Sequence, residues 1–147
     1  MNTHSIAETL RSCLLQNYPE LAIHTPISTG ELVTPYALLS CIAEEELILG
    51  NKTWECSLQV SMHSAALDEE DTAMREQFST LCSVLGKKTT REAINKSAPD
   101  FILYSLSLRS IEEPQTLDND FIQTATFRVV VQFWHRDNIL WLQLSEQ

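Results

Sequence analysis

Glycine is scarce in this sequence: only Gly30, Gly50 and Gly86 occur among its 147 residues. No two of them lie close together, so neither a phosphate-binding loop nor a dinucleotide-binding fingerprint can be formed from them. Long apolar runs are also missing, since no stretch approaches the roughly 20 residues that a membrane-spanning helix requires. The first residues contain no basic region followed by an apolar segment, so we expect no secretory signal. These features predict a cytoplasmic protein without a membrane segment.

Basic residues are few as well, with ten Lys and Arg against twenty Asp and Glu, which gives a net charge of −10. Nucleic-acid affinity depends mainly on basic side chains that neutralise phosphates, so tight nucleic-acid binding is not expected. Hydrophobic residues make up 44% of the chain and charged residues 20%, which is typical of a folded globular protein. The length suits one domain, and we predict a single domain over residues 1–147.

Catalytic and metal-binding patterns are absent. The cysteines form no CxxC pair and fall at apolar positions of periodic segments, so we expect free, buried thiols. The histidines show no zinc-site spacing, and we interpret them as solvent-exposed surface residues. No cofactor, metal or catalytic residue is predicted, and the chain is not expected to be an enzyme; a small enzyme whose residues meet only in the fold is a weaker alternative. The residues concerned are Cys13, Cys41, Cys56, Cys82, His4, His24, His63 and His135.

Acidic clusters have simple structural explanations. Along a strand, Glu44 and Glu46 point to one face and Glu45 to the other, so the three do not converge. Residues 68–71 are all acidic and suit the first turn of a helix, where the helix dipole favours negative charge. The loop 112–120 lacks the EF-hand pattern; we interpret it as solvated, with a hard-cation site as the weaker alternative.

Two main helices are predicted. Ser5 and Glu8 have capping-box spacing, and an apolar face follows until the helix stops before Pro19. The second helix covers about residues 68–85, carries an apolar stripe and ends at Gly86. A short helical turn is expected from Thr89 to Glu92, and a short strand from Leu21 to Thr25.

The clearest strand signal lies at residues 54–63, where apolar and polar residues alternate. Gly50 and Asn51 precede it and suit a two-residue type II′ turn, which predicts an antiparallel hairpin with the preceding extended segment. In this register Leu47 faces Trp54, and the apolar residues of both strands share one face. The same register pairs Cys41 with Val60 and Leu39 with Met62.

Further strands are expected near residues 102–108 and 121–133, and Asp137-Asn138 can turn the chain into a last strand over 139–144. The order helix, strands, helix, strands predicts an α+β fold: a mostly antiparallel sheet with two main helices packed on one face. Trp134 and Trp141 would pair on the face away from the core. We therefore predict an interface that includes Trp134, Leu140 and Trp141; cover by a helix or by the N-terminal segment is the equal alternative.

The order of elements resembles the tail terminator, or tail completion, proteins of long-tailed bacteriophages. The resembling features are an N-terminal helix, Pro35-Tyr36 opening a strand, the alternating strand 55–63, an acidic-start helix ending at 81–85, and the final strand 127–133. The resemblance covers roughly residues 5–133, and the Trp-rich end, 134–147, departs from the pattern.

The resemblance implies a structural protein that forms a ring, usually of six copies, caps the tail tube and joins it to the head connector. Its partners would be other copies of itself, the tail tube and head connector proteins. It would be cytoplasmic in the host during assembly and then part of the virion tail. An acidic lumen that repels DNA phosphates would agree with the charge. The alternative is an acidic, dimeric secretion-type chaperone or another protein-binding module that uses the Trp134/Trp141 patch for its client.

Overall fold

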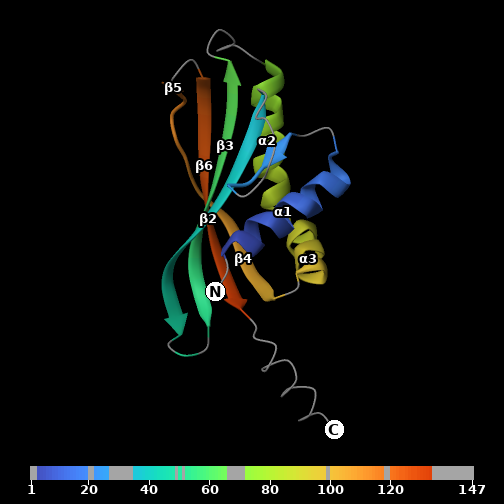
Figure 1. Cartoon of the computed structure of the whole chain (residues 1–147), viewed down its shortest axis with the longest axis vertical. Coiled ribbons are helices and arrows are strands. Elements are labelled where there is room, and N and C mark those ends of the chain that lie inside the picture. Colours follow the sequence, from blue (N-terminus) through green and yellow to red (C-terminus); the bar gives the residue numbers. More distant parts are fainter. Residues whose placement is uncertain are drawn as a thin grey trace.

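The computed structural model describes residues 3–19, 22–26, 35–48, 50, 52–65, 72–98, 100–117 and 120–133. Within these residues, three helices and six strands follow one another (Figure 1). They are α1 (Thr3–Asn17), β1 (Ile23–His24), β2 (Tyr36–Ile48), β3 (Thr53–Ala65), α2 (Thr72–Leu85), α3 (Lys88–Ser97), β4 (Phe101–Ile111), β5 (Gln115–Leu117) and β6 (Asp120–Phe133).

The strands form one mixed sheet in the order β1-β2-β3-β6-β4, and β5 pairs with the beginning of β6. Among the described strands, the short β1–β2 pair is parallel and every other pair is antiparallel. The predicted α+β class with a mostly antiparallel sheet is therefore confirmed.

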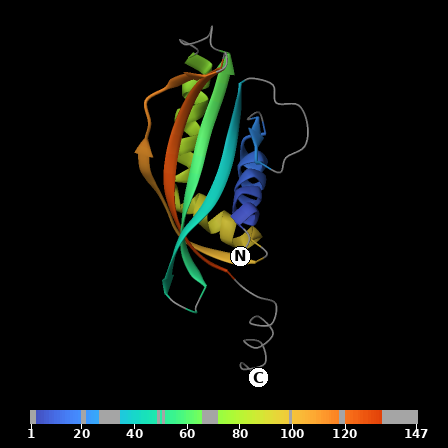
Figure 2. The same cartoon turned by 60° about the vertical axis from the view of Figure 1, so that its left-hand side comes forward.

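All three helices lie on the same face of the sheet (Figures 1 and 2). Side chains alternate between the two faces of a strand, so about every second residue of β2, β3 and β6 points to the face on which the helices lie. These positions are filled by apolar residues such as Leu58, Val60, Phe127 and Val129, all fully buried. The helices contribute their apolar stripes to the same core, with Leu10 of α1 as one member.

The number of helices differs from the prediction, because α3 is a ten-residue helix where a single turn was expected. The β-branched pair Thr89-Thr90 has low helix propensity and suggested a short element. The following residues are good helix formers, and Ile94 is buried in the core at the centre of the helix. Burial of this one side chain stabilises a helix whose other faces are polar.

The β2–β3 hairpin is confirmed, but its register is not the predicted one. Trp54 faces Glu46 rather than Leu47. Ile48 and Thr53 keep the predicted pairing near the turn, and two bulges in β2 then shift the register by two residues. Leu39 consequently faces Val60, and Cys41 faces Leu58. A shift of two leaves the same side chains on the core face, because the side-chain period of a strand is two.

Several predicted features fall partly or wholly outside the described residues. Gly50 has a φ of 85°, in the left-handed region that glycine tolerates, but residues 49 and 51 are not described, so the turn type stays a prediction. The acidic start of the second helix, 68–71, and the C-terminal hairpin also lie outside. The expected loop 112–120 is instead interrupted by β5, whose Thr116 pairs with Phe121.

Candidate functional site

The predicted interface residues Trp134, Leu140 and Trp141 lie outside the described residues, so that interface stays a prediction. The described chain ends at Phe133, whose backbone N–H donates to the carbonyl oxygen of Lys52 at 3.0 Å. Its ring lies 6.4 Å from that of Phe101 at the start of β4. The last described residue therefore lies beside Lys52, just before β3, and beside the first residue of β4.

The face of the sheet opposite the helices holds a charged network. Glu55 of β3 accepts hydrogen bonds at 2.7 Å from Arg109 of β4 and from Arg128 of β6. A guanidinium nitrogen of Arg109 also lies 3.5 Å from a carboxylate oxygen of Glu44 in β2. The Ser57 hydroxyl donates a hydrogen bond to the other oxygen of the same carboxylate. The network links side chains from four strands, and its two acids balance its two cations.

The Ser57 hydrogen bond has an electrostatic consequence. It is the largest cause that lowers the pKa of Glu44 from its ordinary value of 4.5, and the nearby Arg109 charge acts in the same direction. A hydrogen bond that favours the ionised carboxylate keeps Glu44 negative at neutral pH. Chemically the network is an ion-pair cluster that fixes side chains on the open face.

The far half of β2 is exposed and partly apolar. Ile42, Leu47 and Ile48 are 62%, 40% and 55% exposed. Beyond Leu38 no described strand pairs with the outer edge of β2, since β1 reaches only Ala37 and Leu38. Figures 1 and 2 show this end of the hairpin extending away from the helices. We call residues 42–48 the β2 edge segment; unpaired strand edges of this kind are ready to contact another chain.

The core-face prediction for Leu47 is therefore wrong at this end of the hairpin. Alternation tells which residues share a face, but it does not tell whether a helix covers that face. The bulge between Glu46 and Ile48 also turns Leu47 out of the regular ladder. Glu45 and Glu46 lie in the same segment, and charged side chains on an edge limit indiscriminate strand pairing.

A second surface that the sequence analysis did not single out is the basic region of α3. Four of the ten Lys and Arg residues of this acidic chain fall within residues 87–96, with Glu92 as the one acid among them. The signal was present in the sequence as a local reversal of charge. These basic residues are Lys87, Lys88, Arg91 and Lys96.

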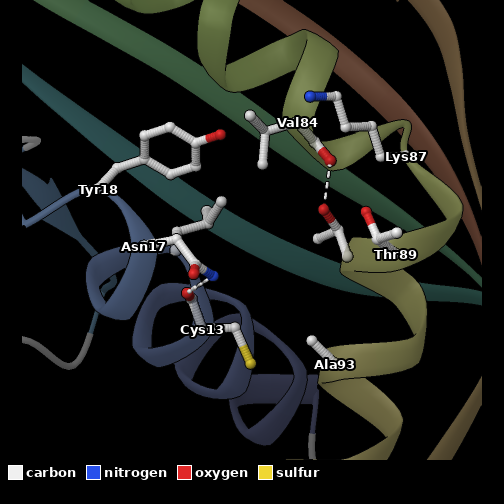
Figure 3. Close-up of a pocket in the computed structure, with 9 residues that line it drawn as sticks. Cys13, Asn17, Tyr18, Val84, Lys87, Thr89 and Ala93 are labelled. Carbon is white, nitrogen blue, oxygen red and sulfur yellow. Dashed lines mark hydrogen bonds between the residues drawn. The ribbon is translucent and has the colours of Figure 1, made fainter.

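A cleft of about 510 Å³ lies between the end of α1 and the α2–α3 junction. Figure 3 shows Asn17 and Tyr18 on one side and Val84, Lys87 and Thr89 on the other. Two of its polar groups are engaged by the fold, because Asn17 donates to the Cys13 carbonyl oxygen at 3.2 Å and Thr90 to that of Val84 at 2.7 Å.

The cysteines agree largely with the prediction. All four are free; Cys13, Cys41 and Cys56 are buried, whereas Cys82 is only half-buried. A hydrogen bond with Cys56 and burial raise the pKa of Cys41 well above its ordinary value, and burial raises the pKa of Cys82 to about 11. The Cys41 and Cys82 thiols are therefore protonated and poorly nucleophilic at neutral pH.

His63 differs from its predicted exposure. It is half-buried and stacks on Tyr36 with ring centroids 4.6 Å apart, and its Nε2 lies 3.1 Å from the Ser61 hydroxyl.

Within the described ranges, no group of three or more His, Cys, Asp or Glu residues could hold a metal ion. None of the described helices is both long and apolar enough to cross a bilayer.

Comparison with known proteins identifies the fold. No protein-family model matches the chain, and no curated protein matches it in sequence. A solved chain from the "Virion of native gene transfer agent (GTA) particle" is similar with a TM-score of 0.63 at 13% identity, over 87% of this chain and 93% of the solved one. A second solved chain has a TM-score of 0.60 at 12% identity, over 92% and 99% respectively.

At these identities the similarity establishes the fold alone. This fold thus occurs in a chain of a gene transfer agent virion particle, which agrees at a coarse level with the predicted resemblance. Membership of the tail terminator family is not established by it.

Proposed function

We propose that this chain is a structural protein of a phage-like virion tail that acts as a tail terminator: it assembles as a ring, caps the tail tube and joins it to the head connector. It acts by contact between proteins, without catalysis. It would reside in the host cytoplasm during assembly and in the virion tail afterwards.

The observation that supports the proposal most is the fold similarity to a chain of the gene transfer agent virion, which spans 87% of this chain. The surfaces described above agree with a role in assembly. An exposed, partly apolar strand edge and a basic helix on an otherwise acidic chain are typical of contact surfaces. Two polar side chains of the cleft, those of Asn17 and Thr90, donate hydrogen bonds to backbone carbonyl oxygens and so hold the backbone around the cleft in place.

Deletion of the gene from a strain that produces the particles tests the proposal. We expect heads and tail tubes to form separately and to remain unjoined, because the component between them is missing. Complementation with the wild-type chain should restore complete particles, in which the chain is present. Normal complete particles from the deletion strain would refute the proposal. A protein that instead purifies as a dimer bound to an unfolded client would favour the chaperone alternative.

A further inference from the structure

The basic region of α3 is not neutralised within the described part of the chain. Arg91 donates to the backbone oxygen of Tyr104 at 3.2 Å. The Lys88 Nζ atom lies 3.9 Å from the Glu92 Oε1 atom, and both side chains are largely exposed. Exposed ion pairs of this kind contribute little to stability. Lys87 is exposed, lies at the rim of the cleft, and forms no ion pair with a described acid. This region therefore presents positive charge beside a cavity.

The β2 edge segment has the complementary character. Glu45 is exposed and faces Glu55 across the strand pair. Because Glu55 is already paired with Arg109 and Arg128, Glu45 adds a negative charge to a network that is balanced without it. Leu47 and Ile48 follow it directly and are both exposed. The end of the segment thus combines the Glu45 carboxylate with the apolar side chains of Leu47 and Ile48 on a strand edge that no described strand covers.

The two surfaces lie apart on one molecule. In both views the β2 edge segment extends from the sheet beyond the helices, whereas α3 packs between α1 and β4 (Figures 1 and 2). Complementary surfaces at different places on identical copies form a head-to-tail contact, which closes into a ring when the rotation between neighbours allows it.

We propose that the cleft between α1 and α3, with Lys87 at its rim, is the docking site for the β2 edge segment of a second copy of this chain. This inference rests on the proposed ring and names its contact. Glu45 pairs with the basic start of α3, while Leu47 and Ile48 enter the cleft, whose walls include the apolar residues Leu14, Val84 and Ala93.

The observations favour a second copy over DNA as the occupant. A net charge of −10 repels a polyanion at long range. DNA in the cleft would also leave the exposed side chains of Leu47 and Ile48 without a contact. A second copy supplies both the acid and the apolar groups, and burial of the apolar groups stabilises the contact.

Two single charge reversals test the contact, Glu45→Lys and Lys87→Glu. Each should raise the protein concentration needed for half-assembly at least tenfold, measured by light scattering at 0.1 M salt. An equimolar mixture of the two variants should assemble better than either alone, because the reversed charges are complementary. Folding should survive, since Glu45 is an exposed strand residue and a carboxylate at the start of α3 agrees with the helix dipole. Thermal melting verifies this.

Matched controls carry the same change of charge elsewhere. Lys96→Glu lies at the other end of α3, and Glu113→Lys lies on the connection between β4 and β5. Both residues are exposed, and both variants should assemble as the wild type does.

The outcomes separate this inference from the proposed function. Wild-type rings that neither Glu45→Lys nor Lys87→Glu weakens would overturn the docking site and leave the ring standing. A wild-type chain that stays monomeric at all concentrations would contradict both. Binding of a DNA duplex that Lys87→Glu alone abolishes would overturn the second copy as occupant.

Discussion

Removal of the Glu55 carboxylate should destabilise the protein, because this acid holds two arginines on the open face of the sheet. Both hydrogen bonds are 2.7 Å long, and the Glu55 side chain is 15% exposed whereas each arginine is 41% exposed. Exposed ion pairs contribute about 0.2–1 kcal/mol each. The low exposure of Glu55 places both pairs near the upper end of that range. We therefore expect Glu55→Ala to lower the free energy of unfolding by about 1.5–2 kcal/mol.

The pairwise part is measurable by a double-mutant cycle with urea denaturation. The cycle of Glu55→Ala with Arg128→Ala should give a coupling energy of about 0.5–1 kcal/mol that shrinks in 1 M salt. Ser107→Ala is the matched control, because Ser107 is exposed and pairs with Arg128 in the strand register; it should change stability by less than about 0.5 kcal/mol. A coupling energy of zero would show that the two charges do not stabilise the sheet, and would refute the reasoning.

Three further predictions concern individual groups. With the pKa of Cys82 raised to about 11, roughly one Cys82 thiol in a thousand is ionised at pH 8. Alkylation of the cysteines in the native protein should therefore be slow, and Cys82 should react before the three buried thiols. Rapid labelling of all four cysteines would contradict the structure. Because the pKa of Glu44 is lowered, its interaction with Ser57 stabilises the fold above the ordinary pKa of 4.5, and this stabilisation is lost as the pH falls through the lowered value. The difference in stability between the wild type and Ser57→Ala should therefore shrink on acidification. A difference that stays constant with pH would argue against the hydrogen bond. Trp141→Asp should weaken self-association more than thermal stability if Trp141 lies in an interface, and the reverse result would place it in the core.

Sequence reasoning predicted the elements whose side chains repeat regularly. The strict alternation over 54–63 and the apolar stripes of α1 and α2 each indicated one element and one buried face, and the structure contains them. Burial of those faces dominates the local energetics, so the pattern of apolar residues was sufficient.

The features that the sequence did not predict depend on other parts of the fold. The two bulges in β2 shift the register by two residues, which leaves the apolar pattern unchanged and so leaves no trace in it. The length of α3 depends on the burial of Ile94 by the core. The exposure of Leu47 and Ile48 depends on where the helical layer ends. The charged network joins Glu55 to Arg109 across 54 residues of sequence, a separation that no local pattern spans.

The mass of the purified chain in solution tests the ring most directly. One copy has a mass of 16.7 kDa, so a ring of six copies would have about 100 kDa and a dimer about 33 kDa. Light scattering over a range of concentrations, with electron microscopy of the same sample, measures both mass and shape. We predict closed rings near 100 kDa at the higher concentrations. A species that remains near 33 kDa or 17 kDa at every concentration, without rings in the images, would contradict the account.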